Sequence, residues 1–236
     1  MRTLIIIPAY NEEKNIGDLL HKILETELDN FDILVINDKS LDSTSEICSH
    51  FNVKVIDLPC NLGIGGAVQT GYKYARKYGY QIAIQVDGDG QHDPNYLKTI
   101  IELLQSKKAD MIIGSRYIEK QGFQSSVLRR VGIRYFSKLI KLLIKEKITD
   151  PTSGYRGCNS NVIEILSQYY PSDYPEPESI VYLKRNGFKI MEIPVKMNER
   201  LGGVSSIRSF RTLYYMIKVS LAIIIDVLRK SPQKEF

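Results

Sequence analysis

The chain has 236 residues and a mass of 27.0 kDa, and its 43% hydrophobic and 25% charged residues are ordinary for a globular domain. Its three cysteines form no CxxC pair, which argues against a disulfide framework or a zinc site and favours a reducing compartment. The net charge of +5 indicates anionic partners, but no aromatic and basic pattern supports nucleic-acid binding.

Short apolar runs alternate with amphipathic segments in the first half of the chain. The runs predict strands at 3–8, 32–36, 53–58, 81–86 and 110–114. The segments between them predict helices at 13–27, 43–50, 64–78 and 94–106. This alternation predicts an α/β fold with a largely parallel sheet flanked by helices. Ligands bind at the carboxyl ends of such strands, where PAYNEE, NDKSLDST and DGDGQHD follow.

The second half of the chain has a different rhythm. It predicts, in order, a basic helix at about 127–147, a helix at 161–169, a proline-rich loop at 170–178, a helix at 179–187, a strand at 189–197 and a terminal helix at 208–230. With no linker or repeat in the sequence, we expect a single domain over residues 1–206 and a C-terminal amphipathic helix within 207–236. No stretch reaches the roughly 20 apolar residues of a membrane span.

The stretch IAIQVDGDGQHDP places two carboxylates directly after an apolar strand. Asp87 and Asp89 lie two apart on a turn that two glycines tighten, and such carboxylates can share a hard divalent cation such as Mg²⁺ or Mn²⁺. An EF-hand is excluded because His92 and Lys98 occupy its glycine and glutamate positions. A solvated turn leading to a helix capped by Asp93 is the structural alternative.

NLGIGGAVQTG, residues 61–71, is a glycine-rich entry to a helix. It is not the dinucleotide fingerprint, because Val68 stands at the third glycine position. The glycines around Gly65 predict either close packing of the helix on the sheet or contact with a phosphate or sugar oxygen.

Six stretches, IIPAYNEEKNI, INDKSLDST, NLGIGGAVQTGY, QVDGDGQHDP, GSRY and DPTSGYRG, together resemble the family 2 glycosyltransferases in order and spacing. The resemblance runs from Leu4 to about Ser206 and is closest to the branch that makes dolichyl- or polyprenyl-phosphate sugars. It implies a GT-A fold with a Rossmann-like sheet and a UDP-sugar donor. It also implies that Asp87, Asp89 and Gln91 hold Mg²⁺ or Mn²⁺ against the donor diphosphate, with Asp89 catalytic.

The same resemblance implies a nucleotide-sugar pocket at the ends of the first strands. Its expected residues are Pro8, Ala9, Tyr10, Glu12, Asp38, Gly65 and Asp87. Asp38 would accept a hydrogen bond from the base. The sequence departs from the usual D-D-G-S at Asn37 and Lys39, which weakens the prediction that the base is uracil. The usual R-x-x-G-x-S-K near the acceptor lacks its lysine here, and Arg208 is the candidate replacement.

The acceptor decides which charges the chemistry needs. A polyprenyl phosphate is already ionised, so it requires arginines that hold the anion while it attacks. The candidates are Arg116, Arg129 or Arg130, Arg156 and Arg200. A sugar hydroxyl would instead require a general base, for which Asp150 and Glu178 are the candidates.

Two further function classes fit the sequence less well. A sugar-phosphate nucleotidyltransferase should carry a GxGxR-type loop after the first strand, where PAYNEE stands. A non-catalytic binding subunit should have lost the paired aspartates, which are intact. We therefore predict an inverting, metal-dependent hexosyltransferase.

The two long helices of the second half predict a surface partner. LRRVGIRYFSKLIKLLIKEK separates apolar and cationic residues, which is typical either of a helix on an anionic membrane or of one packed on its own domain. The terminal helix is apolar most of the way round and must bury against the domain, a second subunit or lipid. We expect a cytoplasmic protein, peripheral at the inner face of the cell membrane, with a possible homo-oligomeric or membrane-protein partner.

Overall fold

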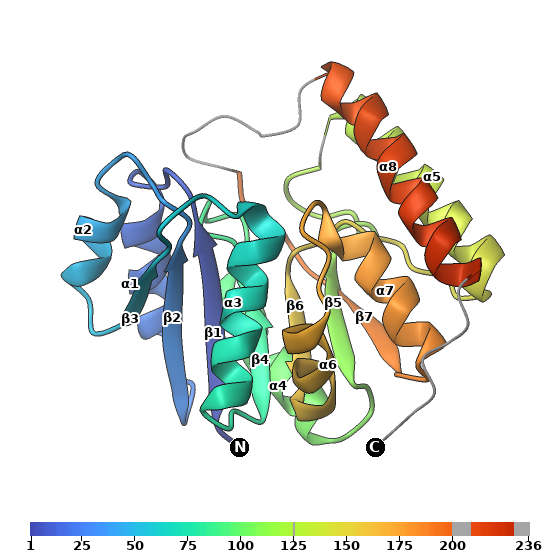
Figure 1. Cartoon of the computed structure of the whole chain (residues 1–236). Coiled ribbons are helices and arrows are strands. Elements are labelled where there is room, and N and C mark those ends of the chain that lie inside the picture. The colour runs from blue at the N-terminus through green and yellow to red at the C-terminus, as the bar shows by residue number, and fades with distance from the viewer. Residues whose placement is uncertain (125, 200–208, 229–236) are drawn as a thin grey trace.

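The computed structural model describes residues 1–124, 126–199 and 209–228, and their core is a sheet covered by helices on both faces (Figure 1). The sheet has seven strands in the order β3-β2-β1-β4-β6-β5-β7. The strands are β1 (Thr3–Ala9), β2 (Phe31–Asn37), β3 (Lys54–Asp57), β4 (Ile82–Gln85), β5 (Met111–Ser115), β6 (Arg156–Asn159) and β7 (Ile190–Pro194). Among these described strands only β6 pairs antiparallel, so the prediction of a largely parallel sheet is confirmed.

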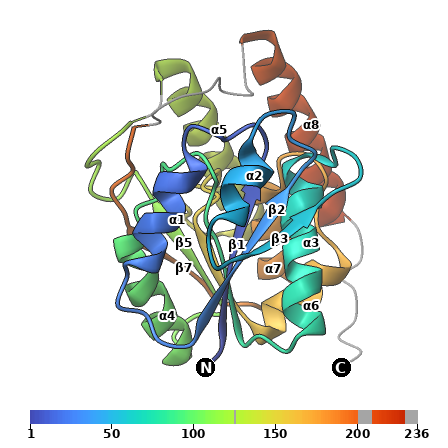
Figure 2. The same ribbon diagram turned by 90° about the vertical axis from the view of Figure 1, so that its left-hand side faces the viewer.

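Helices cover the two faces of the sheet in separate layers (Figure 2). One face carries α1 (Ile16–Leu24), α2 (Thr44–Ser49) and α4 (Leu97–Gln105), the last preceded by the 3-10 turn η1 (Pro94–Tyr96). The other carries α3 (Gly63–Lys77), α6 (Ser160–Gln168) and α7 (Pro175–Arg185), with α5 (Val127–Ile144) and α8 (Ser209–Leu228) beside α7.

β1 illustrates why the sheet needs two covers. Leu4 and Ile6 are fully buried in the core with α3 and α6, while Ile5 and Ile7 are fully buried with α1 and α4. Because successive side chains of a strand point to opposite faces, an apolar run of this kind is stable only between two layers. This burial fixes the register that brings the polar ends of β1, β2 and β4 to one edge.

Two predictions for the second half were wrong. The strand β6 lies within a stretch predicted to have no strand, and α7 begins at Pro175, inside the predicted proline-rich loop. Proline fits the first turn of a helix because its missing N–H has no intrahelical acceptor there. Tyr174, at φ 52°, turns the chain into the helix. The other predicted strands and helices are confirmed, with ends that differ by a few residues.

The helix α8 packs on the domain through one side. Val219 and Ile223 are buried in the main core, and Asp226 pairs with Arg185 of α7. The Tyr135 hydroxyl of α5 lies 3.0 Å from Ser220 Oγ of α8. Within the described part of the chain, no helix combines the length and apolar character needed to cross a membrane.

Candidate active site

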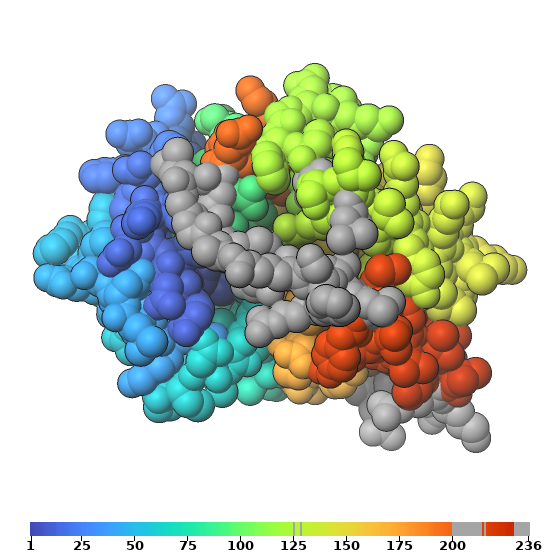
Figure 3. Space-filling view, turned by 90° about the horizontal axis from the view of Figure 1, so that it is seen from above, coloured from blue at the N-terminus to red at the C-terminus, as the bar shows by residue number. Residues whose placement is uncertain are grey.

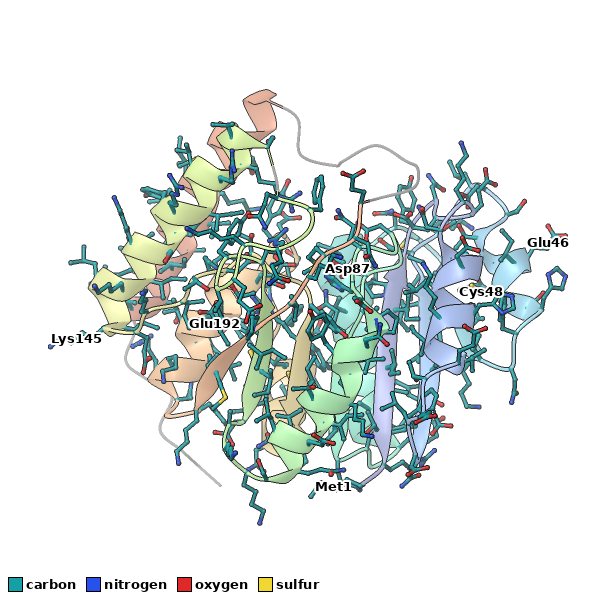
Figure 4. The ribbon with its side chains drawn as sticks, turned by 180° about the vertical axis from the view of Figure 1, so that it is seen from behind. Met1, Glu46, Cys48, Asp87, Lys145 and Glu192 are labelled. Carbon is teal, nitrogen blue, oxygen red and sulfur yellow. The ribbon has the colours of Figure 1, made fainter. Side chains whose placement is uncertain are left out.

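The loops after β1, β2 and β4 meet where the order of the strands reverses. From β1 the chain proceeds outward to β2 and β3, then returns to place β4 on the other side of β1. Gly88 N donates to Pro8 O at 3.2 Å, and Asp38 N donates to Ala9 O at 2.9 Å. Ligands of open α/β sheets bind outside the carboxyl ends of strands at such a reversal. Figure 4 shows Asp87 at this edge of the sheet.

Asp87 is held by side chains on both of its carboxylate oxygens. Its Oδ1 accepts from Gln85 Nε2 at 2.9 Å, and its Oδ2 lies 3.6 Å from His92 Nε2. The His92 ring is buried and stacks on Tyr155 with ring centroids 4.7 Å apart, and its Nδ1 accepts the Asp87 N–H at 3.0 Å. An imidazole that accepts at Nδ1 carries its proton on Nε2 when neutral, so the ring faces Asp87 with a donor.

The glycines of this region make room for the carboxylates. A Cβ on Gly154 would lie 2.6 Å from Asp87 Oδ2, so a larger residue there would displace the carboxylate. Gly90 has φ +73°, a conformation that side chains disfavour. It follows Asp89, whose Oδ1 accepts from Gln91 N at 3.1 Å. The two aspartates thus lie on a short turn whose conformation is fixed by Gly90 and by the hydrogen bond from Gln91 N to Asp89.

The oxygen atoms of Asp87, Asp89 and Gln91 are the ligand type that Mg²⁺ and Mn²⁺ prefer. Among the described residues no three or more His, Cys, Asp or Glu side chains gather into a metal-binding group. Binding of a cation by Asp87, Asp89 and Gln91 therefore stays a prediction, and such a cation would need further oxygen ligands from a bound molecule.

The loop after β1 is built from a network that leaves one aromatic ring outside. Glu12 is buried, its N–H donates to Thr44 Oγ1 at 2.9 Å and its Oε2 accepts from Asn15 Nδ2 at 2.7 Å. The Tyr10 side chain is 46% exposed, whereas Ala9 is buried. Of the residues predicted in this loop, Tyr10 is therefore the one that offers a stacking face to a ligand.

Asp38 and Gly65 both have structural partners at the start of α3. The Asp38 carboxylate accepts from Leu62 N at 2.7 Å and from Gly63 N at 2.9 Å, so it caps the helix. A Cβ on Gly65 would lie 2.1 Å from Pro171 O, which explains the glycine by close packing. Contact of either residue with a nucleotide stays a prediction.

Arg116 and Asp150, predicted in different roles, bind each other. Arg116 Nε donates to Asp150 Oδ2 at 2.6 Å and Nη2 donates to Oδ1 at 2.8 Å, and the side chains are nearly inaccessible. Burial acts to lower the pKa of Arg116, but the Asp150 carboxylate outweighs it and the pKa is raised. The Asp150 N–H donates to Glu192 Oε1 at 2.8 Å. The pair holds the loop before β6 to the end of β5.

Arg156 is buried at the first position of β6 and anchors the same loop. Its Nε donates to Ser153 O at 2.7 Å and its Nη2 to Pro151 O at 3.1 Å, while its Nη1 donates to Ser179 Oγ of α7 at 2.8 Å. The guanidinium therefore ties the loop to α7.

Comparison with known proteins identifies the family. The profile of Glycosyl transferase family 2 matches residues 4–166. The chain belongs to glycosyl transferase family 2. It is 28% identical to a UDP-N-acetylglucosamine–dolichyl-phosphate N-acetylglucosaminyltransferase of Methanococcus voltae, over 94% of this chain and 97% of that protein. It is also 28% identical to a polyprenol monophosphomannose synthase of Mycolicibacterium smegmatis, over 93% of this chain and 86% of that one.

The same comparison settles the fold of this glycosyltransferase. The crystal structure of glucosyl-3-phosphoglycerate synthase from Mycobacterium tuberculosis, in complex with Mn²⁺, UDP and glucosyl-3-phosphoglycerate, superposes with a TM-score of 0.68. It is 16% identical, and the match covers 96% of this chain and 79% of that chain. The predicted GT-A fold and the predicted likeness to the dolichyl- and polyprenyl-phosphate branch are confirmed.

Glu178 was predicted as a candidate base from the sequence, whereas Glu176 was not. Glu178 Oε1 accepts from the Tyr169 hydroxyl at 2.9 Å, on the side of α7 toward the end of α6. Glu176, in the first turn of α7, experiences the charges of Arg156, Asp87 and Arg129, and burial raises its pKa. Acids favour the first turn of a helix, and P-E-P was the available signal.

Of the other arginines predicted to bind the acceptor phosphate, two lie in the described part of the glycosyltransferase and two lie outside it. Arg129 and Arg130 are half-buried in the first turns of α5, where Ser126 caps the helix. Arg129 is the one whose charge reaches Glu176. Arg200 and Arg208 lie outside the described residues.

Proposed function

We propose that this enzyme transfers a hexose or an N-acetylhexosamine, with inversion, from a UDP-sugar to a polyprenyl phosphate. The observation that carries the proposal is the position of Asp87 and Asp89 at the reversal of strand order, beside the loop of Tyr10. The Methanococcus and Mycolicibacterium relatives are named for transfer to dolichyl phosphate and polyprenol phosphate, which supports the acceptor class. UDP in the first of these names supports the donor.

The nucleotide-sugar donor would be bound by residues at the ends of β1, β2 and β4. Tyr10 would stack on the base, and Asp38 would accept from it while capping α3. Asp87, Asp89 and Gln91 would hold Mg²⁺ or Mn²⁺, as the Mn²⁺ in the mycobacterial structure supports. A bound cation would stabilise the negative charge that develops on the departing diphosphate. Gln85 and His92 would keep the Asp87 carboxylate oriented for this task.

The acceptor half would hold the nucleophile rather than deprotonate it. An oxygen of the lipid phosphate forms the new bond to the anomeric carbon as the bond from that carbon to the diphosphate breaks, and the nucleoside diphosphate leaves with the electron pair. Arg129 and Arg130 at the amino end of α5, together with Arg200, would bind the phosphate. Arg116 and Arg156 would act through the loop they hold between β5 and β6.

A second candidate has one observation in its favour. Glu176 has a raised pKa beside Asp87 and Arg156, which suits a general base for a sugar hydroxyl of a growing glycan. Asp150 is less suited to this role, because both of its oxygens accept from Arg116.

The decisive experiment compares acceptors and two kinds of variant. Wild type would be assayed with UDP-glucose, UDP-N-acetylglucosamine and GDP-mannose, each with a short polyprenyl phosphate and with a soluble sugar, in Mg²⁺, Mn²⁺ or chelator. We expect transfer from a UDP-sugar to the lipid phosphate that needs the cation. The double variant Arg129→Gln, Arg130→Gln should then lose more activity than Glu176→Gln. Transfer to the sugar alone, abolished by Glu176→Gln, would establish the second candidate instead.

We further propose that the enzyme acts as a peripheral protein at the cytoplasmic face of the membrane that holds its acceptor. The acceptor class of the relatives supports this location, since a polyprenyl chain is itself confined to a bilayer. Association with a membrane-protein partner or a second copy remains compatible with it.

A further inference from the structure

The helix α8 presents a continuous apolar stripe to solvent. Its members are Tyr214, Ile217, Leu221, Ile224, Ile225 and Leu228, which are between 38% and 79% exposed. Their spacing of three and four places them on one side of the helix. The residues that pack on the domain, such as Val219 and Ile223, lie on the other side. Exposed apolar stripes of this length mark an interaction surface.

The neighbouring helix α5 adds positive charge to the same surface. It runs in the same direction as α8, since Gly132 lies near Met216 and Tyr135 contacts Ser220. Its exposed side carries Arg134, Lys138 and Lys141 beside further apolar residues. No ion pair with a described residue neutralises these three cations.

The surface stands close to the edge of the sheet that carries the site. Asp173, just before the first turn of α7, pairs with Lys218, so the middle of α8 lies near that edge. Figure 1 shows α5 and α8 side by side with their upper ends rising beyond the sheet, and Figure 3 shows both along one side of the face seen from above. A partner of this surface would therefore face the acceptor side of the enzyme.

We infer that the exposed sides of α5 and α8 form a docking face for an anionic lipid bilayer, with the α8 stripe in the interface and the α5 cations at the headgroups. Apolar area and adjacent cations are the two terms that bind a helix to such a surface. A second copy fits less well, because joining two such faces would bring the unpaired cations of α5 together. The inference rests on the proposed function for its purpose, which is to bring the active site to a lipid-borne phosphate.

Vesicle flotation tests the face directly. The full chain would be mixed with vesicles of phosphatidylcholine alone or with added phosphatidylglycerol. We expect wild type to float with the anionic vesicles, and Ile217→Gln with Leu221→Gln to weaken binding by about tenfold or more. The matched control is Leu24→Gln with Tyr78→Gln, at residues 42% and 48% exposed, against 55% and 54% for the test pair. The control pair should bind like wild type.

A variant without the α5 cations separates the electrostatic contribution to vesicle binding from the apolar contribution of α8. Replacing Arg134, Lys138 and Lys141 with Gln should weaken binding to anionic vesicles by about fivefold per cation and flatten its salt dependence. Circular dichroism and the melting temperature should match wild type for all variants. Failure of wild type to bind anionic vesicles would overturn the inference, as would equal binding by the Ile217 and Leu221 variant. So would a wild-type dimer in light scattering that this variant converts to a monomer.

Transfer assays distinguish this inference from the proposed function. With a short, water-soluble isoprenyl phosphate, the Ile217 and Leu221 variant should retain wild-type activity. With a long polyprenyl phosphate embedded in vesicles, it should lose activity in proportion to its lost binding. If no lipid phosphate is a substrate but vesicle binding and its loss are as expected, the docking face stands and the proposed acceptor falls.

Discussion

The proposed donor and acceptor sides of this edge of the sheet differ in what their charged residues contact. On the proposed donor side, Asp38 and Asp87 accept from backbone and side-chain N–H groups, and no cation among the described residues pairs with Asp38. On the acceptor side, Arg116 and Asp150 are committed to each other in a buried pair. A charged residue at a strand end can therefore serve a buried ion pair and not a ligand, as Arg116 and Asp150 do.

The largest expected effect is on the donor side. Asp89→Asn should lower the transfer rate by about 10³-fold or more, because a bound cation supplies several kcal/mol of stabilisation to the departing diphosphate. Steady-state rates at saturating Mn²⁺ and calorimetric titration of UDP with Mn²⁺ would measure the loss. Asp93→Asn is the matched control, since Asp93 caps η1. Equal rates for Asp89→Asn and wild type would remove the aspartate pair from the donor site.

Breaking the buried pair on the acceptor side should chiefly cost stability. Asp150→Asn should lower the free energy of unfolding by about 3–5 kcal/mol, because it leaves the Arg116 charge buried without its partner. Denaturant titration would measure this change. The double variant Arg116→Met, Asp150→Leu should recover much of the loss and still transfer sugar. A stable but inactive double variant would show instead that one member of the pair acts on the substrate.

Asp38 caps α3 and is also proposed to bind the nucleotide base, so removing its side chain should have an intermediate effect on both stability and binding. Asp38→Ala should lower the free energy of unfolding by roughly 0.5–2 kcal/mol through the lost helix cap. It should also weaken UDP binding by roughly 1–3 kcal/mol if the base is its partner. Thermal melts without ligand and calorimetry with UDP and GDP separate the two losses. Unchanged UDP affinity in the variant would leave Asp38 with its capping role alone.

The smallest expected effect is a pH dependence of stability at Glu192, which contacts the loop before β6. Burial raises the pKa of Glu192, which Figure 4 labels. Its carboxylate accepts from Thr149 N and Asp150 N. With the folded pKa above the unfolded one, its contribution to stability is fully present below the unfolded pKa and is lost as pH rises through the folded pKa. The stability of wild type relative to Glu192→Gln should therefore fall over that interval. Denaturant titrations at several pH values would test it, and a constant difference would contradict the assignment.

The strands β1 and β2, which lead into the proposed donor side, could be predicted from sequence because they are long and rich in β-branched residues. β6 gave no such signal, since RGCN is short and contains a glycine, yet it fits between β4 and β5. Gly157 is required there because a Cβ would lie 2.2 Å from Ile100. The pairing of Arg116 with Asp150 spans 34 positions and has no local signature. Glu176 was missed because the prolines beside it suggested a loop.

The antiparallel direction of β6 has a consequence for how the fold can vary. The Ser115 Oγ at the end of β5 lies 2.7 Å from Thr149 Oγ1, so the intervening chain leaves the sheet and returns to the same point. The chain between these two residues, which includes α5, is therefore an insertion between β5 and β6 at the edge of the sheet. The contacts proposed on α5 for the acceptor phosphate and the bilayer thus belong to this insertion, whereas Asp38, Asp87 and Asp89 of the proposed donor site lie outside it.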